Sequence, residues 1–290
     1  MLTPQEVLKF IKKSKKAWEA LFTSGERPDD NQVIKRKLKR MGFESFVDYV
    51  VEMNKLALAH GFLPHTNLGV ISKNEMKKLG KWNASLGLML EQAVELECHN
   101  ESPGKKPEKR IKTIENAGKL KIPFTTGILV GIGESEYDRI YSLEVISEIH
   151  KNYEHIQEVI IQNFMPKKGT PMEDHKPLPI KNIVKTVKIA RKILPKEVAI
   201  QVPPNLVNDL RPLVKAGAND IGGISDCTPD YINPEHPWPS LEDIKRKLGN
   251  AYKLRPRLSI YPRYVKKGWF SDKISNLVHK LADYDGFKKA

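Results

Sequence analysis

The residues best suited to chemistry follow apolar runs of the chain, at the points where those runs end. Residues 122–134, "IPFTTGILVGIGE", begin apolar and β-branched and close on Gly131, Gly133 and Glu134. Glycines at a strand end let a flat ligand approach the backbone, whose N–H and C=O groups can hydrogen-bond its edge. Glu134 either caps the next helix and holds the loop, or contacts the ligand directly. No Gly-Lys-Ser/Thr follows, so the pattern is not a P-loop and a nucleoside triphosphate is disfavoured.

Other apolar runs end in polar or glycine residues in the same way. Each such residue by itself can be a turn or cap residue, but their repetition after successive strands indicates a shared site. In a parallel barrel the carboxyl ends of the strands build the active site. The remaining strand-end residues are Ser24, Gly25 and Glu26; His65, Thr66 and Asn67; Glu91; Gln162 and Asn163; Gln201 and Asn205; and Gly222, Gly223 and Ser225.

The elements that carry these residues alternate between strand and helix. Apolar runs are followed by helical patterns at intervals of about 30 residues, which predicts about six or seven parallel βα units. The runs are continuously apolar, as expected for strands covered by helices. The number of units and the lack of an opening G-x-G-x-x-G turn favour an α/β barrel over a doubly wound sheet. We expect residues 1–290 to form one domain, with a carboxyl-terminal extension from about residue 254.

Capping residues and periodicity predict several element boundaries. Thr3 and Pro4 are suited to the N-cap and first position of a helix. A helical region over residues 30–60 is expected to break near Gly42, and a seventh strand is expected over residues 219–225, "NDIGGIS". A further helix is indicated by apolar residues at a helical period, namely Ile180, Ile183, Val184, Val187, Ala190 and Ile193.

Composition and charge disfavour several classes of protein. Hydrophobic residues make up 40% of the chain and charged residues 29%, an ordinary soluble balance, with no apolar run long enough for a membrane span. The first residues lack the apolar core of a secretory signal. The net charge is +14, but the lysines are scattered over helices, which favours a solvated surface over nucleic-acid binding, and part of the charge suits an anionic substrate or partner. The two cysteines, Cys98 and Cys227, form no C-x-x-C, which fits a reducing cytoplasm.

Several segments resemble those of radical S-adenosylmethionine enzymes. "GILVGIGE" resembles their G-x-I-x-G-x-x-E strand, which lies along the adenine, and "ALFTSGE" resembles their GGE motif with Ser24 in place of the first glycine. Longer segments resemble one family of that superfamily, 7,8-didemethyl-8-hydroxy-5-deazariboflavin (FO) synthase, the small subunit of FO synthase. These are "SPGKKPEKRIKTIENAGKLKIPFTTGILVGIGE", "QNFMPKKGTPM", "QVPPNL" and "GGISDCTPDYINPEHPWP", and the likeness runs from about residue 3 to about residue 265.

The resemblance implies a reaction, two cofactors and a partner. In the family a [4Fe-4S] cluster reductively cleaves S-adenosylmethionine to methionine and a 5′-deoxyadenosyl radical. The radical abstracts hydrogen from a hydroxybenzyl-ribityluracil adduct, which a partner subunit makes from tyrosine. Ring closure with ammonia loss then gives the deazaflavin FO, so the family is a lyase of deazaflavin coenzyme biosynthesis. The implied partners are this small-molecule substrate and that subunit, with no nucleic acid and no membrane.

The resemblance also implies roles for individual residues. Glu26 would meet the methionine amino group, and Glu91 would accept hydrogen bonds from the ribose hydroxyls. Arg110 would pair with the methionine carboxylate, because a guanidinium fork suits that oxygen pair; without the family it would be interpreted as a surface helix arginine. Gly127 and Gly131 would line the adenine. Glu134 completes this cofactor set, and the weaker candidates on the substrate side are Asn163, Gln201 and Asn205.

The sequence departs from the family at the cluster. The family's C-x-x-x-C-x-x-C, in the loop after the first barrel strand, has no counterpart here. Cys98 and Cys227 lie elsewhere and cannot replace three clustered thiolates, so no metal ligands are predicted. We therefore expect a partial TIM-like barrel that lacks the first strand and the cluster loop, either because the gene product is truncated at its amino terminus or because the cluster has been lost.

Two other interpretations are compatible with the residues. One is a different radical enzyme of similar core, such as a biotin-synthase-like or thiazole-tyrosine-lyase-like protein, against which the segment "GGISDCTPDYINPEHPWP" argues. The other is a non-catalytic barrel that keeps a ligand pocket and serves as a binding or partner subunit.

Overall fold

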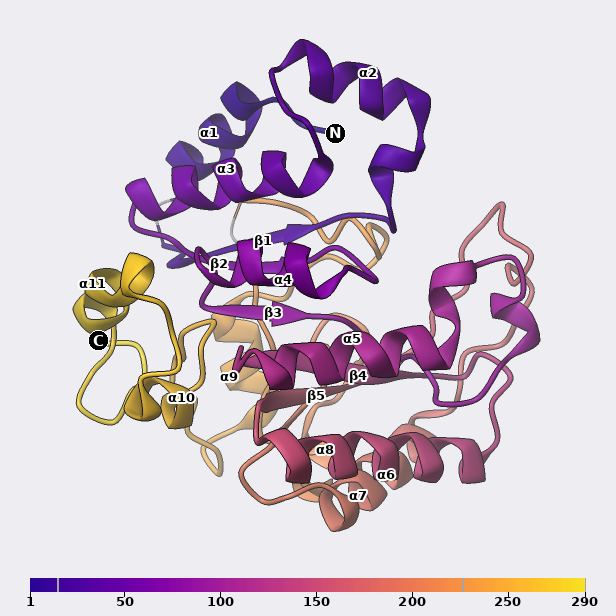
Figure 1. The fold of residues 1–290 in the computed structure, drawn as a ribbon. Helices are drawn as coiled ribbons and strands as arrows, with labels where there is room; N and C mark the ends of the chain where they lie inside the picture. Colours follow the sequence, from indigo (N-terminus) through magenta and orange to yellow (C-terminus); the bar gives the residue numbers. More distant parts are fainter. Residues whose placement is uncertain (15, 226, 290) are drawn as a thin grey trace. The chain divides into compact units, whose positions relative to one another are not determined.

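The computed structural model describes residues 1–14, 16–225 and 227–289 and contains a parallel six-stranded sheet (Figure 1). The strands are hydrogen-bonded in sequence order, and this order does not close on itself. The α/β fold with an open, partial barrel sheet is therefore confirmed. The strands are β1 (Glu19–Thr23), β2 (Leu63–Asn67), β3 (Ser85–Gly87), β4 (Phe124–Val130), β5 (Ile156–Asn163) and β6 (Ala199–Gln201).

The expected seventh strand, over residues 219–225, is wrong as a strand. Within that segment only Asp220 bridges to β6, through Gln201. Gly222 has φ +73°, which lies outside the β region, so the backbone leaves the sheet direction at that residue. The segment 219–225, although rich in apolar and glycine residues, is therefore a loop after the single bridge at Asp220.

Capping fixes the first helices as the sequence predicts. Thr3 accepts a hydrogen bond from the backbone N–H of Glu6 at 3.3 Å, and Pro4 is the first helical residue. The region 30–60 breaks where Gly42 has φ +84°. The α-helices are α1 (Pro4–Lys13), α2 (Gln32–Arg40), α3 (Phe46–Ala59), α4 (Lys73–Gly80), α5 (Pro107–Lys119), α6 (Glu136–Tyr153), α7 (Ile180–Ile193), α8 (Arg211–Ala216), α9 (Leu241–Leu248), α10 (Pro262–Lys267) and α11 (Asp272–Leu281).

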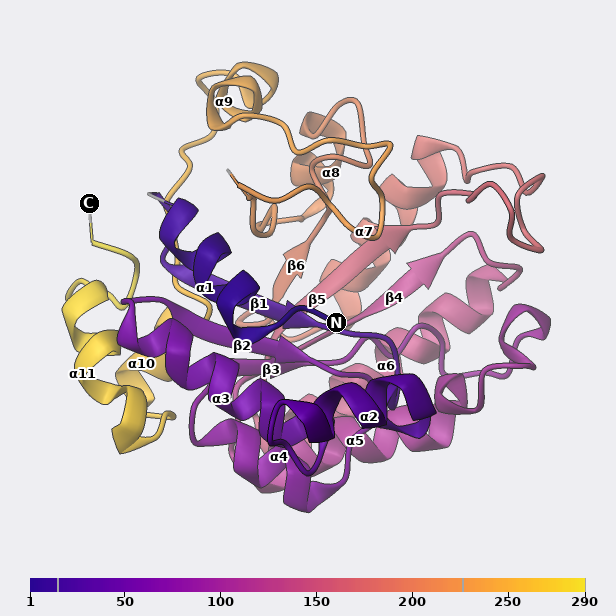
Figure 2. The same ribbon diagram turned by 90° about the horizontal axis from the view of Figure 1, so that it is seen from above.

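The chain divides into two units, and the first comprises residues 1–88, 113–124 and 255–290. In this unit α3 packs against β1 and β2, with α4 beside α3 (Figure 2). The β1–β2 register pairs Leu21 with His65, and the β2–β3 register pairs His65 with Ser85. The last stretch of the chain, from Arg255, belongs to this unit together with α10 and α11.

The second unit comprises residues 89–112 and 125–254. Helix α7 packs against β5 and β6 and contacts α6 and α8 (Figure 1). Its predicted apolar face is buried at Ile183, Val187 and Ala190, whereas Ile180, in the first turn, is 46% exposed. The helical period thus selects the face of α7 that covers the sheet.

Across the described part of the chain, no helix is both long and apolar enough to cross a membrane.

Candidate functional site

Glu91 occupies an unusual backbone position just after β3. The backbone φ of Glu91 is +65°, in the left-handed region that non-glycine residues rarely adopt, and the whole residue is 7% exposed. The backbone is held there by β4, because the Glu91 N–H donates to Gly127 at 3.2 Å and its C=O accepts from Leu129 at 3.0 Å. Strained residues of this kind cluster at functional sites. The sequence predicts a strand that ends at Glu91, whereas β3 ends at Gly87 and Glu91 forms an isolated bridge to Ile128 of β4.

Two cations lie beside the Glu91 carboxylate. Lys105, from the loop before α5, forms an ion pair with it, and Nη1 of Arg110 lies 3.6 Å from its Oε1. The side chains of Glu91 and Arg110 are 9% and 4% exposed, whereas that of Lys105 is 31% exposed. A buried carboxylate with one accessible cation can exchange that cation for a ligand's donors.

Arg110 is a buried residue and not a surface helix arginine. Its Nε donates to the C=O of Gly104 at 2.9 Å, and its Nη1 donates to the C=O of Met89. The guanidinium thus holds the loop before α5 and the segment after β3 together around Glu91. Its pairing with a methionine carboxylate stays a prediction.

Close packing explains the glycines of β4 and of the loop that follows it. A Cβ on Gly127 would lie 2.3 Å from the backbone oxygen of Ile160 in β5 and 2.8 Å from Cε of Met89. A Cβ on Gly131, which has φ +98°, would lie 2.8 Å from Leu178. The reason given from the sequence, room for a flat ligand, is therefore not needed to explain either glycine, and their contact with adenine stays a prediction.

Glu134 holds the loop that follows β4. Its two carboxylate oxygens accept from the backbone N–H groups of Gly131 at 2.8 Å and Ile132 at 2.7 Å, and Oε1 also accepts from Nε of Arg139 at 2.7 Å. Its side chain is fully buried. Of the two roles that the sequence allows, this geometry provides the structural one.

Glu134→Gln is expected to lower the free energy of unfolding by about 2 kcal/mol, because hydrogen bonds to a buried charged group are weakened or lost. The matched control is Glu136→Gln, since the Glu136 side chain is 44% exposed and its change should stay within about 0.5 kcal/mol. Urea unfolding of both variants measures the difference. Equal stability of the two variants would contradict the structural role.

Glu26 belongs to the first unit. It follows β1, is partly exposed, and its Cγ would lie 3.1 Å from a Cβ built on Gly69. Gly69 has φ +75° and follows β2, so the ends of β1 and β2 meet at this pair. The structure thus places Glu26 at the carboxyl end of its strand, as expected.

The substrate-side candidates lie in the second unit. Asn163 is 7% exposed and donates to the C=O of Leu206 at 3.0 Å, while no described group pairs with its Oδ1. Asn205 donates to Asp230 at 2.9 Å, and its Oδ1 likewise has no partner within the described chain. Gln201 packs on Gly222, where an added Cβ would lie 2.5 Å from Nε2. The amide oxygens of Asn163 and Asn205 are therefore buried acceptors to which a ligand could donate hydrogen bonds.

Comparison with known proteins decides the family. The chain is 59% identical over 290 residues to the 7,8-didemethyl-8-hydroxy-5-deazariboflavin synthase of Archaeoglobus fulgidus, covering 100% of this chain and 90% of that protein. The synthase of the same name from Methanococcoides burtonii is 50% identical, with 100% and 88% covered, and that of Methanopyrus kandleri is 48% identical, with 99% and 89% covered. The chain belongs to the FO synthase family. No protein-family model matches it.

Solved structures share the fold of this FO synthase family member. HydG, a maturase of the [FeFe]-hydrogenase, matches with a TM-score of 0.70 at 14% identity, covering 95% of this chain and 62% of that one. Methylornithine synthase (PylB) matches with a TM-score of 0.59 at 18% identity, covering 85% and 72%. At these identities the likeness concerns the fold, and it supports the partial barrel.

The residues of this chain do not fit an iron–sulfur cluster of the kind the family resemblance implies. Cys98 is exposed and Cys227 is partly exposed, and the described residues contain no group of three or more metal-ligating side chains. No step of the chemistry is therefore assigned to a cluster held by these residues.

Sequence reasoning missed two residues at the Glu91 site. Lys105 pairs with Glu91, and His99 lies near it; burial first and the charge of Lys105 second lower the pKa of that imidazole. Lys105 lies inside the family-specific segment "SPGKKPEKR", which carried the only available signal. Because the chain is rich in lysine, no local sequence pattern distinguishes Lys105 from the other lysines.

His65 in β2 is neutral at physiological pH. Burial first and the nearby charge of Arg257 second lower its pKa from 6.5 to about 4. Its Nδ1 lies 2.7 Å from Oγ of Ser85. Between pH 6.5 and about 4 the imidazole of His65 is therefore neutral in the folded chain but protonated in the unfolded chain, so the unfolded chain binds one more proton.

The free energy of unfolding is thus expected to be highest above pH 6.5 and to fall as the pH drops toward 4, with up to about 3 kcal/mol of the loss due to His65. His65→Asn, which keeps a donor for Ser85 but cannot titrate, should lose less stability over this range. Urea unfolding at several pH values measures both proteins. Parallel pH curves for the two proteins would contradict the assignment.

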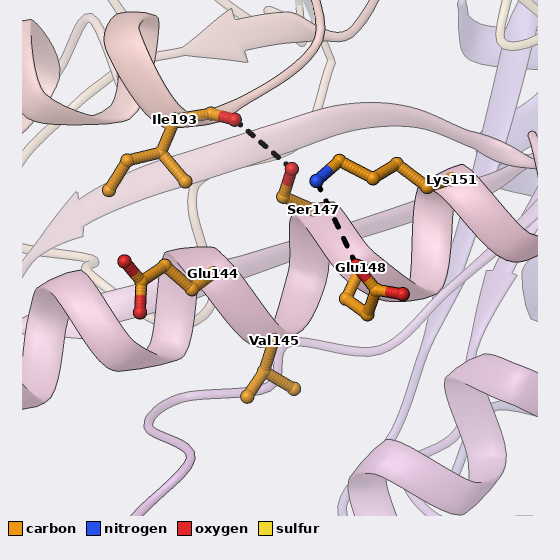
Figure 3. A pocket seen from close by; sticks show the side chains of 6 residues that line it. All are labelled: Glu144, Val145, Ser147, Glu148, Lys151 and Ile193. Carbon is orange, nitrogen blue, oxygen red and sulfur yellow. Dashed lines mark hydrogen bonds and ion pairs between the residues drawn. The ribbon is translucent and has the colours of Figure 1, made fainter.

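A groove of about 530 Å³ along α6 is separate from these residues. There the Ser147 hydroxyl donates to the C=O of Ile193 at the end of α7, at 3.0 Å (Figure 3). The groove is lined by Glu144, Val145, Ser147, Glu148, Lys151 and Ile193. None of these follows a strand, so the groove is not part of the candidate site.

Proposed function

We propose that this chain acts in forming 7,8-didemethyl-8-hydroxy-5-deazariboflavin as a radical S-adenosylmethionine enzyme. The observation that supports this most is the 59% identity over the whole chain to the Archaeoglobus fulgidus synthase. The proposed substrate is the hydroxybenzyl-ribityluracil adduct, which closes its ring with loss of ammonia, a lyase reaction. We also propose a partner subunit that supplies this adduct, and a cytoplasmic location.

The residues around Glu91 fit S-adenosylmethionine. Glu91 would accept the ribose hydroxyls, because it is a buried carboxylate whose one accessible partner, Lys105, can be displaced. Arg110 and Lys105 supply the positive charge that the methionine carboxylate requires. Glu26 would meet the methionine amino group, and the β4 backbone at Gly127 would contact the adenine. Bound S-adenosylmethionine would be the source of the 5′-deoxyadenosyl group, and its cleavage to methionine and the radical would require one electron from a reductant that the described residues do not hold.

The adduct would lie against the amide residues of the second unit. Asn163 and Asn205 each present a side-chain oxygen that no described group pairs with. A buried acceptor without a donor costs about 1–3 kcal/mol, so a ligand that brings donors is favoured there. The hydroxyls of a ribityl chain and the N–H groups of a uracil are such donors, and Gln201 would complete this set.

Calorimetric titration of the purified chain tests the proposal. S-adenosylmethionine is added first and the adduct second, and we expect both to bind. Asn163→Ala should weaken adduct binding about tenfold, as expected for one hydrogen bond, and leave S-adenosylmethionine binding unchanged. Failure of S-adenosylmethionine to bind would contradict the proposed function.

A second candidate is a ligand-binding barrel without chemistry of its own. It is favoured by the absence of a metal-ligating group within the described residues. Anaerobic iron reconstitution followed by an assay for FO separates the two candidates. FO formed by the chain excludes the binding-only role, whereas ligand binding without FO supports it.

A further inference from the structure

Asp230 lies in the loop between α8 and α9 and binds the side chain of Asn205, 25 residues earlier in the chain. Nδ2 of Asn205 donates to Oδ2 of Asp230 at 2.9 Å and to the backbone C=O of His236 at 3.0 Å. A carboxylate and a carbonyl oxygen can only accept hydrogen bonds, so the NH₂ of Asn205 must face them. The amide oxygen of Asn205 is therefore turned away from them, and it is buried with no partner among the described residues.

The carboxylate of Asp230 has no capacity left for a ligand. Its Oδ1 accepts from the backbone N–H groups of Ile232 at 2.9 Å and Asn233 at 3.1 Å. Its Oδ2 accepts from the Asn233 side chain at 3.1 Å, as well as from Asn205. A carboxylate offers about four acceptor positions, and these donors fill them. Asp230 can therefore position Asn205 but is not available to bind a substrate itself.

Lys167 fixes the other side-chain amide that Asp230 binds. Nζ of Lys167, in the loop between β5 and α7, donates to Oδ1 of Asn233 at 2.8 Å, and an ammonium group can only donate. The NH₂ of Asn233 is thus left to face Asp230. Asn233 is 6% exposed, so these bonds lie in a packed part of the second unit. The loops after β5, β6 and α8 are therefore linked by hydrogen bonds that determine the orientation of each amide.

Asn163, the last residue of β5, presents its oxygen in the same way. Its Nδ2 donates at 3.0 Å to the C=O of Leu206, the residue after Asn205, and its Oδ1 is buried without a described partner. Buried polar atoms of folded proteins nearly always have a hydrogen-bond partner. The two oxygens of fixed orientation therefore favour a ligand that donates hydrogen bonds over one that only accepts them.

We propose that Asp230 is a positioning residue that sets the substrate specificity of this site through Asn205. By holding the Asn205 amide with its oxygen toward the ligand, it makes the site select the hydroxyl donors of the ribityl chain. Without the carboxylate the amide can turn and present its NH₂, to which a group that only accepts binds equally well. The inference rests on the proposed function, which supplies the ribityl adduct, and it adds the residue that orients the acceptor.

The test uses the hydroxybenzyl-ribityluracil adduct and a set of adducts in each of which one ribityl hydroxyl is replaced by fluorine, which is close to a hydroxyl in size but cannot donate. In calorimetry the wild-type chain should bind at least one fluorinated adduct about fivefold to tenfold more weakly than the adduct itself. Asp230→Asn keeps an oxygen for the backbone N–H groups of Ile232 and Asn233 but places an NH₂ opposite Asn205. In this variant the fluorine penalty should fall to about twofold or less.

A double-mutant cycle shows whether Asp230 acts through Asn205. Asn205→Ala should lose the same fluorine penalty, and adding Asp230→Asn to it should change the penalty no further. Asp209→Asn is the matched control, since it removes a carboxylate of the same unit that is 43% exposed and pairs with Arg211, and it should keep the wild-type penalty. S-adenosylmethionine should bind all of these proteins alike, which reports that they are folded.

An Asp230→Asn protein that keeps the full fluorine penalty would overturn the inference, as would a further effect of this change in the Asn205→Ala background. A wild type that binds every fluorinated adduct as tightly as the adduct would overturn it too and leave the proposed function intact. Failure of the wild type to bind the adduct or S-adenosylmethionine would contradict the proposed function itself. Side-chain amide NMR of the ligand-free wild type needs no variant. Both NH₂ protons of Asn205 should exchange slowly with solvent, and rapid exchange would also overturn the inference.

Discussion

Gly127→Ala is expected to lower the free energy of unfolding by about 3 kcal/mol or more. The added Cβ would lie 2.3 Å from the backbone oxygen of Ile160 and 2.9 Å from its Cβ. Backbone of a central strand cannot move aside as a flexible side chain can, so β4 and β5 must separate locally. Chemical denaturation followed by circular dichroism measures the loss.

The matched control for this change is Gly223→Ala in the same unit. Gly223 has no heavy atom within 4 Å of an added Cβ and no positive φ, so its change should stay within about 0.5 kcal/mol. If the two alanine variants unfold at the same denaturant concentration, the close approach of β4 and β5 is not what requires a glycine.

Glu91→Ala is expected to have the second large effect, about 3 kcal/mol in stability. Removing the carboxylate takes away the negative charge that lies 3.6 Å from Nη1 of Arg110, whose side chain is 4% exposed, and breaking a buried ion pair costs about 3–5 kcal/mol. Lys105 is 31% exposed and can turn to solvent, which places the cost at the lower end. Thermal and urea unfolding measure it.

The same substitution is expected to weaken S-adenosylmethionine binding by about 1.5–3 kcal/mol, roughly 10-fold to 150-fold, because the ribose loses a charged acceptor. Glu91→Gln, which keeps an acceptor oxygen, should retain more of both properties. Glu95→Ala is the control, since Glu95 is an exposed carboxylate four residues away. Equal S-adenosylmethionine affinity in Glu91→Ala and Glu95→Ala would show that Glu91 is not the ribose acceptor.

Local rules determined much of the fold. Thr3 and Pro4 begin α1, and Gly42 ends the helical region before α3, because caps and left-handed glycines act over a few residues. The alternation of apolar runs and helical patterns gave the parallel strands, since burial on both faces leaves a continuous apolar signature. The same rules failed for residues 219–225, where composition favoured a strand but Gly222 turns the backbone out of the sheet.

Local sequence rules predict some features of the candidate site but not the contacts between its side chains. That Asn163 and Gln201 end their strands and that Glu26 follows β1 could be predicted from the sequence, because apolar runs mark where strands stop. That Lys105 pairs with Glu91 depends on the path of a loop, and it has no local pattern.

The sequence by itself determined the α/β class, the strand-end positions of the candidate residues and the family resemblance, because these depend on residue types at short spacings. Tertiary structure alone decided that Gly127 is required by β5 and that Glu134 holds its own loop. It also decided that Ser85 lies between His65 and Ser259, since its hydroxyl donates to the C=O of Ser259, 174 residues away, and its Oγ lies 2.7 Å from Nδ1 of His65. Contacts between residues so far apart in the chain exist only once the strands have packed, so no local pattern could contain them.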